Sequence, residues 1–131
     1  MCGHGLGSGR FLMTVLFVLL ILLQIKHWLI DFVYQTDQEI QWKGTYGDWR
    51  GLMHSAKHGL ATASVMVIGM VDLHWVYVLA MLDFVLHYHI DWIKMQWGNR
   101  NMHDPQFWTH LGLDQMAHQM CYLLYVWVIV A

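Results

Sequence analysis

The chain has 131 residues, of which 57% are hydrophobic and only 12% are charged. Soluble domains carry about a quarter charged residues, so this length and composition argue against a soluble domain and indicate a single domain in a membrane. The formal net charge of −2 gives no reason to expect nucleic acid as a partner.

The N-terminal part of the chain combines a glycine-rich stretch with a long apolar run. We predict a flexible leader over residues 1–10 and a first membrane helix over residues 11–34, because about 20 apolar helical residues cross a bilayer. No small-x-small cleavage motif follows the run, which argues against a cleaved signal peptide. The helix ends with His27, Asp31 and Gln35, which are four residues apart and would share one face.

A polar, glycine-containing loop over residues 36–51 precedes the second predicted membrane helix, residues 52–71. This helix begins with His54 and His58, again four residues apart. Its small residues, among them Gly59, are typical of positions where membrane helices pack closely.

The third predicted helix, residues 74–95, follows a very tight turn and has a continuous polar stripe. Asp83, His87, Asp91 and Lys94 are spaced by four, four and three residues, so one face of the helix contains all of them. Ionisable groups at membrane depth usually face the interior of a bundle or a water-filled cavity.

The fourth predicted helix, residues 107–130, follows a polar loop over residues 96–106 and completes the single domain 11–131. It begins with Asp114, Gln115 and His118. Short connections between long helices favour antiparallel neighbours, so we predict an all-α, integral membrane, up-down bundle of four transmembrane helices. In that topology all the polar residues lie at one end and converge on one cavity.

Histidine and aspartate in this arrangement are typical ligands of zinc, iron or manganese, so we expect a divalent metal. The candidate ligands are His27, Asp31, His54, His58, His87, Asp91, Asp114 and His118. The candidate outer contacts to ligands or substrate are Gln35, Asp83, Lys94 and Gln115. The eight candidate ligands are more than one tetrahedral site needs. They would suit two metal ions, or one metal ion whose ligands are oriented by the remaining residues.

The chemistry of such a cavity has three interpretations. A metal with an open position activates water, which suggests a metal-dependent hydrolase acting on a lipid-like substrate. Alternatively, the polar groups join the helices within a non-enzymatic component of a membrane assembly. A third alternative is proton or ion translocation, with Asp83 as the deepest ionisable group; the apolar outer halves of the other three helices argue against it.

The distribution of basic residues orients the chain. Arg10 is the only lysine or arginine on the side with both termini, and the other six lie on the opposite side. The positive-inside rule therefore places both termini on the non-cytoplasmic side and the cavity towards the cytoplasm. We assign Lys26 to the water interface, and Asp37 and Glu39 to solvent or to the start of a short surface helix. The expected partner is the lipid bilayer, with a homo-oligomer or a membrane complex left open.

Four stretches together resemble a known family. They are HWLIDFVYQTD at 27–37, HSAKHG at 54–59, HYHIDWIK at 87–94 and DQMAHQ at 114–119. Over residues 20–125 the chain resembles the domain of unknown function 3307, a family of small polytopic membrane proteins of bacteria and their phages. The resemblance implies a multi-helix membrane protein with this polar signature, and it implies no activity.

Overall fold

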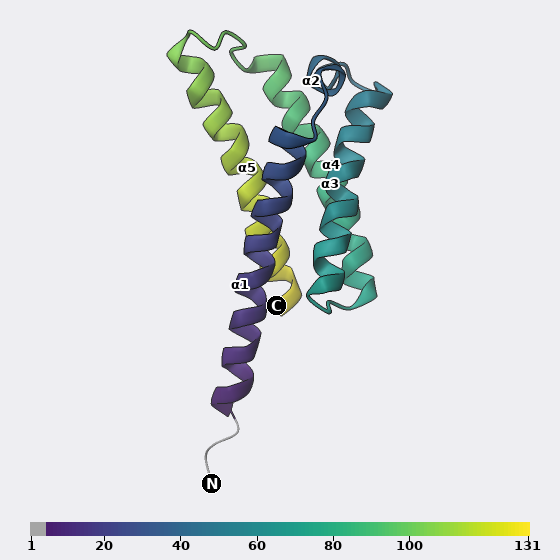
Figure 1. Cartoon of the computed structure of the whole chain (residues 1–131), viewed down its shortest axis with the longest axis vertical. Coiled ribbons are helices and arrows are strands. Elements are labelled where there is room, and N and C mark those ends of the chain that lie inside the picture. The colour runs from purple at the N-terminus through teal and green to yellow at the C-terminus, as the bar shows by residue number, and fades with distance from the viewer. Residues whose placement is uncertain (1–4) are drawn as a thin grey trace.

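The computed structural model describes residues 5–131, which are helical throughout apart from short connections (Figure 1). Its elements are α1 (Gly5–Trp28), the π-helix η1 (Leu29–Val33), α2 (Asp37–Trp42), α3 (Trp49–Ile68), α4 (Leu73–Trp97) and α5 (Pro105–Val130). The described residues contain no strand. The predicted all-α class is therefore confirmed.

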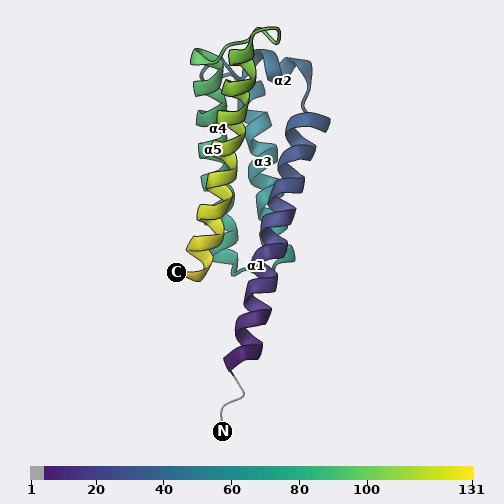
Figure 2. The ribbon, with the colours of Figure 1, turned by 90° about the vertical axis from the view of Figure 1, so that its left-hand side faces the viewer.

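The four long helices alternate in direction along the chain (Figure 1). α3 packs against α1 and α4, and α5 packs against α4 and α1, so that the four helices close into a bundle. The N-terminal part of α1 extends beyond the other helices (Figure 2). An apolar core that includes Leu19, Leu23, Met66 and Leu79 fills the half of the bundle nearer the C-terminus.

Two helical segments, Gly9–Val33 and Leu73–Trp97, are long and apolar enough to cross a membrane. Many large apolar side chains face outwards on the other helices as well. Leu60 of α3 is 71% exposed and Trp127 of α5 is 64% exposed. Exposure of such an apolar surface to water is unfavourable, whereas its contact with the hydrocarbon of a membrane is not.

The helix bounds differ most from the predicted ones at the N-terminus and at the turn before α4. Residues 5–10 of the predicted flexible leader are helical, because glycine weakens a helix without ending it as proline does; residues 1–4 of that leader lie outside the described residues. The predicted tight turn before α4 is longer, since α3 ends at Ile68. The turn closes through Met70, whose φ is 54°, and a bond from the Val71 amide to the Met66 carbonyl, 3.0 Å long.

The loop after η1 contains the short surface helix α2, which was one of the two alternatives for this segment. Thr36 and Glu39 form a capping box in which the Thr36 amide donates to Glu39 Oε2 at 2.8 Å. The alternative of a solvated Glu39 is wrong, because Glu39 is buried and its carboxylate pairs with Lys57. Burial alone would raise the pKa of Glu39, but the hydrogen bonds from Lys57 and the Thr36 backbone outweigh it and hold this pKa below its usual value.

We expect Gly59→Ala to destabilise the bundle by about 1–3 kcal/mol, since overpacking has that effect in cores. A Cβ at this position would lie 2.8 Å from the Ala80 carbonyl oxygen and 3.2 Å from Phe84 Cβ. Thermal unfolding in detergent measures the effect. Gly112→Ala in α5 is the control, because nothing lies within 4 Å of a Cβ there. Equal melting temperatures for the two variants would contradict close α3–α4 packing at Gly59.

Candidate metal centre

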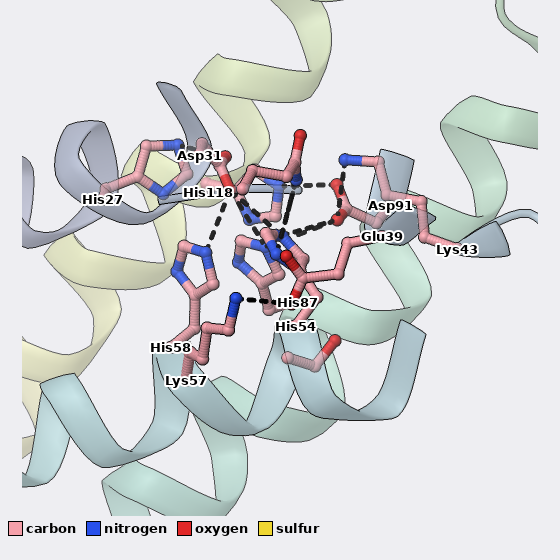
Figure 3. Close-up of polar contacts among 12 residues, drawn as sticks. His27, Asp31, Glu39, Lys43, His54, Lys57, His58, His87, Asp91 and His118 are labelled. Atoms are coloured by element: carbon pink, nitrogen blue, oxygen red, sulfur yellow. Dashed lines mark hydrogen bonds and ion pairs between the residues drawn. The ribbon is translucent and has the colours of Figure 1, made fainter. Parts of the chain in front are cut away.

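The structure brings all eight predicted ligands into one buried cluster at the end of the bundle nearest α2. Figure 3 labels all of them except Asp114. Its imidazole rings contact one another directly. His87 stacks on His58 with ring centroids 3.5 Å apart, and on His118 at 4.1 Å. The predicted cavity is therefore a packed cluster of side chains, in which His54, His58 and His87 are at most 1% exposed.

Asp31 lies at the centre of the first part of the cluster. Its Oδ1 atom is 2.9 Å from Nε2 of His58, 3.1 Å from Nε2 of His54 and 3.7 Å from Nε2 of His87. Its Oδ2 atom is 3.2 Å from Nε2 of His27. Within the described residues no lysine or arginine pairs with this carboxylate, although its side chain is only 6% exposed.

The π-helix η1 determines how Asp31 is presented. Its wide turn is closed by a bond from the Tyr34 amide to the Leu29 carbonyl, 2.8 Å long, and such turns often occur at functional sites. The predicted helical column stops there, so Gln35 lies beyond the helix. Nevertheless, Gln35 Nε2 is 3.0 Å from Nε2 of His54, and the residue contacts the cluster as predicted.

The second part of the cluster contains Asp91, Asp114 and His118. Nε2 of His118 is 3.6 Å from Asp91 Oδ1 and 3.5 Å from Asp114 Oδ1. The other oxygen of each carboxylate pairs with a lysine, at 3.1 Å from Lys43 and at 3.0 Å from Lys94. Burial would lower the pKa of Lys43, but the nearby carboxylates, chiefly that of Asp91, raise it above its usual value.

The spacing of the imidazole nitrogens is close to that of a metal site, whereas the two shortest contacts of Asp31 Oδ1, 2.9 and 3.1 Å, are hydrogen-bond distances that a bound ion would lengthen. Bonds of about 2.0–2.2 Å in tetrahedral geometry place neighbouring ligand atoms about 3.3–3.6 Å apart. Nε2 of His54 and Nε2 of His87 are 3.3 Å apart, and Asp31 Oδ1 lies beside both. One nitrogen or oxygen each from Asp31, His54, His58 and His87 falls within 4.8 Å of the others, which gives the three-nitrogen, one-oxygen set that zinc and iron accept.

A deeper polar layer adjoins the cluster. Asp83 accepts hydrogen bonds from Lys26 at 2.6 Å, Thr62 at 2.7 Å and Tyr125 at 3.0 Å. The assignment of Lys26 to the water interface is wrong, since it is only 6% exposed; a buried carboxylate requires a cationic partner, and Lys26 supplies it. Lys26 Nζ is also 3.4 Å from Nδ1 of His58, so this layer connects to the histidines.

Sequence reasoning missed four residues that contact the predicted polar groups: Thr62, Tyr122, Tyr125 and Lys43. His27 bonds through Nδ1 to the Tyr122 hydroxyl at 2.8 Å and through Nε2 to the Gln115 carbonyl oxygen at 2.9 Å; Gln115 was predicted and Tyr122 was not. Extending the four-residue spacing by one step along each helix identifies Tyr122 after His118 and Thr62 after His58. Nothing in the sequence marks Lys43, because it reaches Asp91 from the connection after α2.

The family model described as "Protein of unknown function (DUF3307)" matches residues 18–131. The chain belongs to this family. No curated protein and no solved structure matches it. The match confirms the resemblance drawn from the four polar stretches, and all eight clustered side chains of this DUF3307 protein lie within it.

An apolar groove of about 360 Å³ lies between α4 and α5, beside the second part of the cluster in this DUF3307 protein. Its lining includes Ile93, Trp97 and Leu113, together with the polar residues Lys94 and Asp114. Because Asp114 lines the groove and also faces His118, the groove adjoins the His/Asp cluster.

Proposed function

We propose that this protein is a multi-pass membrane metalloprotein that binds zinc, iron or manganese through Asp31, His54, His58 and His87. One observation carries the proposal: three imidazole nitrogens surround one carboxylate oxygen that no lysine or arginine of the described chain neutralises. A buried carboxylate needs a cationic partner. A divalent ion among these four atoms would supply the charge and would use the nitrogens as ligands.

The membrane part of the proposal extends from two spans to four. The segments Gly9–Val33 and Leu73–Trp97 have the required length and apolarity. α3 and α5 lie beside them in the same bundle and have apolar outer faces. The excess of lysine and arginine near the cluster favours a cytoplasmic position for that end and a non-cytoplasmic position for both termini.

Hydrolysis is the reaction class that we propose. A bound ion with an open position lowers the pKa of water to about 7. The groove between α4 and α5 gives an apolar molecule a route to the cluster, since its lining joins Leu113 and Ile93 to Lys94 and Asp114. It lies at the C-terminal end of the α4 span, where lipid headgroups would be. A lipid-like substrate with an acyl chain fits this position.

We expect the purified protein to contain tightly bound metal, and His54→Ala/His58→Ala to lose it, because two of the four ligand atoms are then missing. Elemental analysis after loading with zinc, iron or manganese measures the content. The matched control is His74→Ala/His103→Ala, which removes two exposed histidines and should keep the wild-type content. Mass spectrometry of membrane lipids incubated with the same preparations tests hydrolysis, with a chelated sample as reference.

A purely structural polar network is the second candidate, and the layer around Asp83 favours it. Under that account the double histidine variant would assemble equally poorly with and without metal, and the wild-type protein would gain no stability from any of the three ions. Translocation has less support, because the apolar core around Leu19, Met66 and Leu79 has no carboxylate, lysine or histidine among its described residues.

A further inference from the structure

Three buried polar atoms of the second part of the cluster lack hydrogen bonds. They are Asp91 Oδ1, Asp114 Oδ1 and His118 Nε2, and none has a hydrogen-bond partner within residues 5–131. Their residues are 2%, 6% and 2% exposed. Buried polar atoms are nearly always hydrogen-bonded, so three unpartnered atoms at one point require an explanation.

The three atoms face one another at distances that are long for hydrogen bonds. His118 Nε2 is 3.6 Å from Asp91 Oδ1 and 3.5 Å from Asp114 Oδ1, whereas nitrogen–oxygen hydrogen bonds are about 2.7–3.2 Å long. Ligand atoms that share one tetrahedral ion, with bonds of about 2.0–2.2 Å, are about 3.3–3.6 Å apart. The lysines pair with the Oδ2 atoms of Asp91 and Asp114, so neither Oδ1 atom has an ammonium partner. Lys43 uses one lone pair of Asp91 Oδ2, and the other remains for an ion.

We propose that Asp91, Asp114 and His118 bind a second divalent metal ion, and that Asp91 bridges the two ions. Its Oδ2 atom is 3.4 Å from Nε2 of both His54 and His87, next to the first site, while Oδ1 faces His118 (Figure 3). One carboxylate thus has an oxygen towards each group of ligands. This inference rests on the proposed function, since the first ion occupies the site around Asp31.

The two ions would differ in access. The first is enclosed by Asp31 and three histidines that are almost completely buried. The second has only three ligands from the protein, and Asp114 also lines the groove between α4 and α5. The second ion is therefore the one with an open position beside the substrate route, where paired ions stabilise both the attacking and the leaving oxygen in hydrolysis.

Counting ions in the full-length protein tests the proposal. Zinc-loaded wild type should contain two ions per chain by elemental analysis, and Asp114→Asn/His118→Gln should contain one. Asp72→Asn/His89→Gln removes the same residue types from exposed positions and should keep two. One ion in both the wild type and the Asp114→Asn/His118→Gln variant would overturn the second site and leave the first. No ion in the wild type would overturn the proposed function itself.

A measurement on the wild type alone covers the case in which the variant fails to fold. The manganese-loaded protein should give the electron paramagnetic resonance spectrum of two exchange-coupled ions, because a shared carboxylate holds bridged ions about 3.5–4 Å apart. A spectrum of isolated ions only would overturn the bridge at Asp91. A single equivalent of manganese with an isolated-ion spectrum would overturn the second site while the first remains.

Discussion

Asp31→Asn is expected to weaken metal binding by more than the roughly 10–100-fold that loss of an outer-shell partner causes, because it removes the charge of the carboxylate at the centre of the first site. The same change should lower the stability of the metal-free protein by less than it lowers that of the metal-loaded protein. The reason is that the metal-free protein loses only the contacts of Asp31 with histidines, such as the 2.9 Å hydrogen bond with His58, whereas the metal-loaded protein also loses a charged ligand. Competitive metal titration and thermal unfolding, each with and without metal, measure the two effects.

A large loss of metal affinity, together with a larger loss of stability with metal than without it, identifies Asp31 as a ligand. Asp37→Asn is the control, since Asp37 is exposed in the first turn of α2, and it should change neither quantity. If Asp31→Asn lowers the melting temperature of the metal-free protein and leaves metal affinity unchanged, Asp31 serves only to join η1 to α3.

Lys26→Met is expected to destabilise the protein by about 3–5 kcal/mol, because removal of one partner from a buried ion pair leaves an uncompensated charge. Lys26 and Asp83 are 2.6 Å apart and both almost fully buried. Thr62 and Tyr125 would still donate to Asp83, but neither carries a charge. Denaturant or thermal unfolding in detergent measures the loss.

Two further variants separate the charge from the volume. Lys26→Met/Asp83→Asn removes both charges and should recover most of the lost stability. Lys57→Met breaks the pair with Glu39, in which the lysine is 35% exposed, and should cost less than Lys26→Met. A loss for Lys26→Met no larger than that for Lys57→Met would show that the Lys26–Asp83 pair contributes little.

The bundle can be predicted from the sequence because the apolar runs and the polar residues spaced by four occur in the same helices. His54 and His58, or His87 and Asp91, must share a face, and antiparallel packing then places those faces at one level. Intrahelical spacing and short connections are local properties, so the sequence reveals them. The positions of the eight clustered side chains follow from these two properties.

Other features depend on contacts that spacing does not encode. The π turn at Asp31 arises where one helical turn contains an additional residue. The sequence LIDFV has nothing that distinguishes it from the sequence of an ordinary α-helix. Lys43 reaches Asp91 from outside the long helices, so its role depends on how the connection folds back. In the sequence, Lys26 beside His27 resembles a residue at the membrane–water interface. The Lys26 side chain points inwards because it pairs with Asp83, which lies deep in the bundle on α4.

The reach of Lys43 has a thermodynamic consequence. Lys43, in the connection between α2 and α3, supplies a cation to Asp91. The ordering of that connection and the binding of metal to the cluster are therefore coupled by a single free energy. By linkage each must change the other by the same factor. A change that stiffens or cleaves this connection should therefore alter the affinity of the cluster for metal, although the connection lies outside the long helices. In turn, the rate at which a protease cleaves the connection should depend on whether metal is bound.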